Sequence, residues 1–560
     1  MNTEDHLTNM DVEQPRPPNV SSNTNSICSN RSKYQSMDLS GSVYLVSGDG
    51  KIISLPMPSR SPRDPLNWSR KRRVLAFLPV LWYQIVCLVL VQGTSSLYLG
   101  FLQEFSSADM RPFGPAALVS ATSLFQGIGT FLWAPLSLAI GRRPTFVLAT
   151  VVLTASTLWA AITSNFHQYL LALCFGAIAQ GFALSGSLLL IIDLTFIHER
   201  PLAVALNWSL TPSFAYAIFS LAPEMCDAGT NYKLFYQIWL IPCLISIVLA
   251  ILFVPETYFI RPAQSYDGRI LAQSATEKTE FYESWEACPG GKELPDEPEV
   301  HKWWLMRSQY RLFVTTRAGW RGMWACYPQI ALCVVNPLIF WVAVLQAVML
   351  CSYISIGETI VGTLTSEPYN LSPITGARGC FAVVPASLLT WPVCNYVLSK
   401  ASKKLALRNN GVREAEYYLP AFIIPVLAAV LSNVLYGIAV DRVWNYVIIV
   451  GALLLNVFAF YSIAIVGTVW VTEAFPRWAA PGIVVVYGIS YTTSSCMSYV
   501  VMPWIRLQGI QAMQLELALA VFVVGCVGIP FVFIGKRVRQ RINGRWAVSE
   551  AGALRPQASE

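Results

Sequence analysis

The chain has 560 residues, of which 54% are hydrophobic and 13% are charged, and its formal net charge is +7. A soluble globular domain carries about 25% charged residues, so this composition excludes that class and predicts a membrane protein. The positive charge collects in segments expected on one side of the membrane, which favours an anionic cytoplasmic leaflet over a nucleic-acid partner.

Twelve stretches of about 18 to 26 mostly apolar residues are each long enough to cross a hydrocarbon core of about 30 Å as a helix. One long interior connection divides them, which predicts an all-α membrane protein with twelve transmembrane helices in two six-helix bundles. The domains are then a disordered cytosolic tail at 1–63, bundles at 64–255 and 329–535, a linker at 256–328 and a cytosolic tail at 536–560. The spans are expected at 74–99, 115–138, 145–164, 169–192, 202–222, 233–255, 329–357, 376–398, 418–440, 444–472, 479–502 and 514–535.

Basic residues set the orientation of these spans. Four consecutive cations, Arg70 to Arg73, precede the first span and place its start in the cytosol. With twelve crossings both tails are cytosolic, and the loops on that side carry more arginine and lysine than the opposite loops.

The linker has an acidic first part and a second part, Lys302 to Tyr327, that mixes arginines with tryptophans. This mixture is typical of helices that lie in the cytoplasmic membrane interface, with apolar side chains in lipid and arginines at phosphates. A solvated linker is the alternative.

Charged residues at the cytosolic ends of the spans predict an inner gate. Asp193 and Glu473 follow long apolar runs, and a carboxylate near a helix C-terminus needs a cation to offset the helix dipole. We expect acid–base pairs to hold the halves together when the transporter opens outward, although the arginines could instead only anchor topology. The predicted gate residues are Gly141, Arg142, Arg143, Asp193, Arg200, Glu473 and Arg477.

Four short motifs resemble the major facilitator superfamily, within it the fungal branch similar to twelve-span drug:proton antiporters. The resemblance covers residues 64 to 540 and implies two bundles that work by alternating access, with export of a drug, toxin or secondary metabolite. The motifs are Asp64 to Trp68, Gly141 to Pro144, Asp193 with His198 to Arg200, and Pro255 to Thr257.

The chain departs from the family's signatures at several positions. The acid of the loop between the second and third spans is Leu138 here, the arginine of the fourth span is Ala177, and the paired glycines of the antiporters' fifth span are absent. These departures put proton antiport in question. With the loop's own acid lost, Asp193 is the partner we expect for Arg142 or Arg143.

Polar and aromatic residues within the spans outline a central cavity for an amphipathic, neutral or weakly cationic molecule. Glu358 is the main candidate for a proton-coupled or cation-attracting carboxylate, because an ionisable group in a span is costly; capping of the outer helix end is the alternative. The other candidates are Gln84, Gln92, Gln126, Gln180, Asn207, Trp208, Asn336, Trp341, Tyr353, Trp391, Asn395, Asn456 and Tyr461.

The sequence contains neither a GxxxxGK[ST] phosphate loop nor metal-ligand spacing among its cysteines and histidines. We therefore expect a monomeric transporter, not an enzyme, that lies among membrane lipids and needs no cofactor or metal. Its expected partners are a small-molecule substrate and, as a candidate, protons, in the plasma membrane or alternatively the vacuolar membrane. Two other functions stay open: uptake of a nutrient or organic cation such as a polyamine, and a transceptor or scaffold that signals through the linker.

Overall fold

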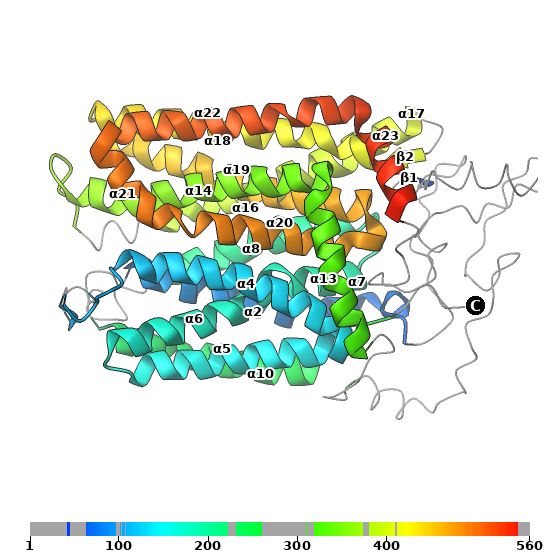
Figure 1. The fold of residues 1–560 in the computed structure, drawn as a ribbon, viewed down its shortest axis with the longest axis horizontal. Helices are drawn as coiled ribbons and strands as arrows, with labels where there is room; N and C mark the ends of the chain where they lie inside the picture. The colour runs from blue at the N-terminus through cyan, green and yellow to red at the C-terminus, as the bar shows by residue number, and fades with distance from the viewer. Residues whose placement is uncertain are drawn as a thin grey trace, which may run out of the picture.

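The computed structural model is a bundle of long, roughly parallel helices in two groups (Figure 1). The structure describes residues 42–44, 63–96, 101, 104–106, 108–221, 231–259, 310, 319–372, 380–408 and 412–546. The helices of the first half are α2 (Arg70–Ser96), α4 (Ala116–Ile140), α5 (Arg142–Ile162), α6 (Phe166–Leu184), α7 (Gly186–Leu194), α8 (Arg200–Phe219) and α10 (Tyr232–Phe253). Those of the second half are α14 (Pro337–Thr365), α16 (Val383–Asn395), α17 (Ser402–Arg408), α18 (Ile423–Asp441), α19 (Tyr446–Ala474), α20 (Ala479–Ser494), α21 (Met497–Gln508), α22 (Ile510–Cys526) and α23 (Gly528–Trp546).

Ten helical stretches in the described residues are long and apolar enough to cross a membrane. The eighth and eleventh predicted spans are also helical but interrupted, after α16 by the π-helical turn η5 (Tyr396–Ala401) and between α20 and α21. Hydroxyl groups near the second interruption bond to backbone carbonyls, as Ser495 Oγ does to Thr492 O at 2.7 Å, and such bonds commonly bend helices.

The seventh span begins later than the sequence predicted. A separate helix, α13 (Gly319–Val335), occupies the first residues assigned to it, and α14 starts at Pro337. Asn336 between them is extended because the residue before a proline avoids the α region, and its side chain accepts a hydrogen bond from the Leu338 amide at 3.0 Å. Helix α13 runs across the long axis, against α4 of the first half and α20 of the second (Figure 1).

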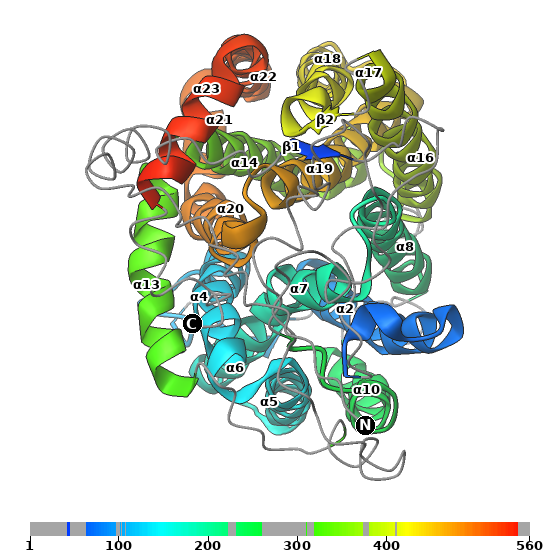
Figure 2. The ribbon, with the colours of Figure 1, turned by 90° about the vertical axis from the view of Figure 1, so that its right-hand side faces the viewer.

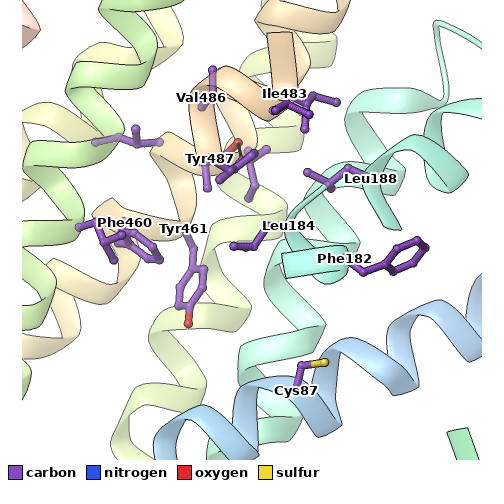
Figure 3. Packing of buried hydrophobic residues seen from close by; sticks show 14 of the residues in the cluster. Cys87, Phe182, Leu184, Leu188, Phe460, Tyr461, Ile483, Val486 and Tyr487 are labelled. Carbon is purple, nitrogen blue, oxygen red and sulfur yellow. Dashed lines mark hydrogen bonds between the residues drawn. The ribbon is translucent and has the colours of Figure 1, made fainter. Parts of the chain in front are cut away.

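The two halves meet along two pairs of helices, α4 against α20 and α8 against α16 (Figure 2). Buried side chains from both halves form one continuous apolar core, shown in close-up in Figure 3. Within the first half, α4 and α6 approach so closely that a Cβ on Gly181 would lie 2.6 Å from the Gln126 carbonyl oxygen. Small residues are what allow such close helix contacts in a membrane.

One end of the bundle carries most of the ion pairs, and we call it the charged end; the excess of arginine and lysine predicts that it is cytoplasmic. A two-stranded antiparallel sheet also lies there, formed by β1 (Ser42–Tyr44) and β2 (Val412–Glu414). The expectation of a disordered tail is therefore wrong for residues 42–44, because a strand of the second half provides backbone partners for them.

Further short elements frame this end. They are the 3-10 helices η1 (Pro65–Asn67), η6 (Ala415–Phe422) and η7 (Pro476–Trp478). A further one, η4 (Cys380–Ala382), leads into α16.

Candidate functional site

The turn at Gly141 joins α4 directly to α5 and binds a carboxylate. Gly141 has φ +98°, a conformation that favours glycine, and a Cβ there would clash with the Glu256 carboxylate. The backbone amides of Arg142 and Arg143 donate to Glu256 Oε1 and Oε2 at 2.9 and 3.2 Å. The amino end of α5 is therefore an anion-binding helix terminus, filled by the protein's own glutamate.

The expected pair of Arg142 and Asp193 is present. Arg142 Nε lies 3.3 Å from Asp193 Oδ2, both side chains are buried, and the guanidinium also donates to Ser137 Oγ. Both residues belong to the first half, so the expectation that this pair holds the two halves together is wrong. The pair instead joins α5 to α7 within one bundle.

Arg143 points to different partners. Its guanidinium donates to the Ile251 carbonyl oxygen at 2.7 Å and to the Tyr310 carbonyl oxygen, and it lies 5.1 Å from the centre of the Tyr310 ring. Arg143 therefore connects the Gly141 turn to the end of α10 and to the linker.

A second ion pair crosses between the halves. Arg200 Nη1, at the start of α8, lies 3.8 Å from Glu473 Oε1 near the end of α19, and Arg413 Nη2 lies 2.9 Å from Glu473 Oε2. The exposed fractions of the three side chains are 3%, 5% and 5%. Because Asp193 also acts electrostatically on Arg200, charges of alternating sign extend from Arg142 through to Arg413. Arg477 lies in η7, but its side chain is outside the described residues.

The segment after Arg413 is fastened to the carboxyl-terminal helix. Arg539 of α23 is fully buried and makes a bidentate pair with Glu416, at 2.9 and 3.0 Å. Lys536 of the same helix pairs with Glu414. Bidentate geometry makes the first of these contacts strong and directional.

Aromatic side chains fill the contact between the halves deeper in the bundle. The indole of Trp208 on α8 stacks on Tyr487 of α20 at 5.4 Å between ring centres and lies 6.3 Å from Tyr461 of α19. Figure 3 shows Tyr461 and Tyr487 in this region. We use the name aromatic cluster for Trp208, Tyr216, Tyr353, Phe460, Tyr461 and Tyr487.

The rest of the cluster continues this pattern. Tyr353 of α14 stacks on Phe460 of α19 at 4.9 Å, and its hydroxyl bonds to that of Tyr216 on α8. Each half thus contributes rings to the same cluster. Two buried polar atoms of α8, Nε1 of Trp208 in the cluster and Oδ1 of the preceding Asn207, have no hydrogen-bond partner among the described residues, which leaves them available to a ligand.

Several predicted cavity residues make hydrogen bonds inside a bundle. Gln126 Nε2 donates to Gln180 Oε1 at 2.9 Å, joining α4 to α6. Gln84 donates to the Ala183 carbonyl oxygen at 3.1 Å, and Asn456 donates to Ser352 Oγ at 2.9 Å. Such bonds are the usual role of amides between membrane helices.

Other predicted cavity residues lie elsewhere. Asn336 caps α14 at the charged end, and Asn395 accepts a hydrogen bond from Ser399 Oγ at 3.0 Å where α16 becomes π-helical. Trp391 is 38% exposed on α16 beside the exposed Leu388, and Trp341 donates to the Val524 carbonyl oxygen in the core of the second half. For these four residues the cavity role stays a prediction that these contacts do not support. The side chain of Gln92 is outside the described residues.

Glu358 is half-buried on α14, far along the helix from the charged end, near Ser498 of α21. Its carboxylate therefore lies toward the opposite end of the second half.

The structure adds residues that sequence reasoning did not select for the site: Tyr216, Glu256, Arg413, Glu416, Phe460, Tyr487 and Arg539. Glu256 could have been found, because it stands in the Pro255 to Thr257 motif. In the sequence, Arg413 indicated only that its loop is cytosolic. Its role in the ion pairs was not visible there, because its partner Glu473 is 60 positions away.

Comparisons with known proteins agree with this architecture. The sequence pattern of the Major Facilitator Superfamily matches residues 81–479. Protein HOL1 of Saccharomyces cerevisiae is 22% identical over 90% of this chain and 94% of its own length. An uncharacterized MFS-type transporter of Schizosaccharomyces pombe is 21% identical over 88% of this chain and 89% of its own length.

Two solved structures share the fold. The human organic anion transporter MFSD10 superposes with a TM-score of 0.52 at 14% identity, over 84% of this chain and 100% of that chain. The proton:xylose symporter XylE superposes with a TM-score of 0.51 at 14% identity, over 84% of this chain and 99% of that chain. The chain is a multi-pass membrane transporter and belongs to the major facilitator superfamily.

Proposed function

We propose that the protein moves a small amphipathic organic cation across the plasma membrane by alternating access, through a site at the aromatic cluster. The stacking of Trp208 of one half on Tyr487 of the other carries the proposal. Because each half supplies rings, separation of the halves opens the cluster and their closure covers a bound molecule. The fold alone does not set the substrate, since the similar structures act on different molecules.

The chemistry of the cluster favours a cation with an apolar body. Electron-rich faces of tryptophan and tyrosine attract cations, and the rings provide stacking area. The half-buried Glu358 on α14 offers a carboxylate for attracting the cation or for carrying a proton. The unpartnered Asn207 Oδ1 can accept a hydrogen bond from an ammonium group.

We propose export as the direction, as the resemblance to drug:proton antiporters implies. The test is the accumulation of radiolabelled tetraphenylphosphonium in cells with and without the protein, across an imposed pH gradient. Lower accumulation in cells that contain the protein supports export, and higher accumulation supports uptake of organic cations. Equal accumulation of this probe, and of a set of aliphatic diamines, would contradict the proposed substrate class.

Two variants connect transport to the cluster. Trp208→Ala removes a ring at the contact between the halves, and a loss of about 1–2 kcal/mol of binding raises KM by about 5- to 30-fold. Trp208→Phe keeps a ring with a weaker attraction for cations, so its KM should lie between those of the unchanged protein and Trp208→Ala. Trp324→Ala, at an exposed tryptophan of α13, is the matched control and should leave KM unchanged.

Glu358→Gln tests proton coupling. If Glu358 carries the proton, the variant transports without a response to the pH gradient. A variant whose pH dependence equals that of the unchanged protein would eliminate this role and leave Glu358 as a cap of the helix end.

A further inference from the structure

Strand β1 precedes the first half in the sequence but pairs with a strand of the second half. Residues Ser42, Val43 and Tyr44 pair antiparallel with Glu414, Arg413 and Val412 of β2. The chain then enters the first half at η1, where Asp64 and Leu66 are buried. This segment is therefore held by one bundle and continues into the other.

The partner strand is the segment that positions the ion pairs between the halves. Arg413, the register partner of Val43, holds Glu473 at 2.9 Å, and Glu473 also faces Arg200 of the first half at 3.8 Å. The neighbouring Glu414 pairs with Lys536 of α23. The backbone position of β2 thus sets the position of the Arg413 guanidinium, which holds Glu473 next to Arg200.

We propose that Ser42–Tyr44 is a latch, added to β2 as a strand in cis, which stabilises the closed charged end and unpairs when that end opens. Strand addition obtains its stability from main-chain hydrogen bonds, and three residues provide only a few. Each such bond contributes a modest net stability, so the latch is reversible. Its loss shifts the population toward the open charged end by about threefold to tenfold.

The first test breaks the strand within the full chain. Val43→Pro removes a backbone N–H and fits poorly in a paired strand, whereas Ser36→Pro, outside β1, is the matched control. Opening is measured at Thr472→Cys, a fully buried position beside Glu473, by the rate at which a membrane-impermeant maleimide labels it in inside-out vesicles. Peptide mass spectrometry distinguishes this site from the native cysteines.

We expect Val43→Pro to raise the labelling rate by about threefold to tenfold and Ser36→Pro to leave it unchanged. A rate that is equal or lower in Val43→Pro would overturn the latch.

The second test fixes the strand in place. Tyr44 and Val412 are register partners, so Tyr44→Cys with Val412→Cys places two thiols at a separation that a disulfide can bridge. Oxidation should cross-link this pair and slow labelling at Thr472→Cys, and reductant should restore it. Tyr44→Cys with Trp320→Cys, on the exposed face of α13, is the control that should not cross-link. Failure of the register pair to cross-link, or a cross-link without effect on labelling, would contradict the proposal.

Neither test needs a transported substrate. A negative result would contradict the proposed latch and leave the proposed transport function unaffected.

Discussion

Arg200 of α8 and Glu473 of α19 join the two halves at the charged end, while Arg413 holds the same glutamate from within the second half. The arrangement is asymmetric. When the halves separate, Glu473 keeps Arg413 as its partner, whereas Arg200 loses its only cross-bundle carboxylate among the described ion pairs. Separation therefore does not leave the Glu473 carboxylate without a cation.

This asymmetry predicts different effects for the two partners. Glu473→Gln leaves two buried arginines without their acid and should lower the free energy of unfolding by about 3–5 kcal/mol. Arg200→Gln removes the contact across the halves and the attraction between Arg200 and Asp193 but leaves Glu473 paired with Arg413, so it should cost less stability and raise maleimide labelling at Thr472→Cys. Thermal unfolding in detergent and the labelling rate measure the two effects. Equal losses of stability in both variants would contradict the asymmetry.

Gly141→Ala should destabilise the first half. The variant forces alanine into a positive φ and places a Cβ against the Glu256 carboxylate, and together these should cost at least about 2 kcal/mol. Gly451→Ala is the control, because Gly451 lies in α19 with no atom near the position of a Cβ. A melting temperature that falls equally in both variants would refute the special role of the Gly141 turn.

His198, between α7 and α8, makes stability depend on pH. Burial lowers the pKa of His198 below 6.5, Arg413 and Arg73 act in the same direction, and Glu199 opposes them. Because the folded state binds the proton less well than the unfolded state, this contribution is complete above about pH 6.5 and decreases as the pH falls. The melting temperature between pH 7.5 and 5.5 should therefore fall less steeply in His198→Gln. An identical pH profile in the variant would show that another group is responsible.

The Glu416–Arg539 pair should show strong coupling in a double-mutant cycle. Glu416→Met or Arg539→Met alone leaves one buried charge, with an expected loss of about 3–5 kcal/mol, whereas the double variant Glu416→Met/Arg539→Met leaves none and should lose less than either. Unfolding of the four proteins measures the coupling. Additive losses would mean that the two groups act independently.

Ten of the spans were predictable because a helix that crosses lipid needs a long apolar run, and loops with charges separate such runs. The interruptions of the eighth and eleventh spans were not predicted. The pairing of Arg142 with Asp193 was also predictable. Leu138 replaces the loop's own acid, so the arginine needed a carboxylate from another segment. The start of α14 at Pro337 could have been found from the proline itself, although the apolar run continued through it.

Other features depend on tertiary contacts that leave no local pattern. The side chains of Gln126 and Gln180 hydrogen-bond to each other, while that of Trp391 is exposed. The residue types alone do not distinguish these two environments. Arg413 resembles any other basic loop residue until the fold brings it to Glu473. Strand β1 is only three residues long, too short for a periodic signal.

Helix α13 has a consequence for how the chain can be divided. It precedes the second half in the sequence, yet it packs on α4 of the first half as well as on α20. If the protein is made as two fragments divided between residues 260 and 309, the second fragment contains α13, which can bind α4 of the first fragment. Co-expressed fragments should reconstitute the transporter when the second begins before Gly319 and should fail to do so when it begins at Pro337.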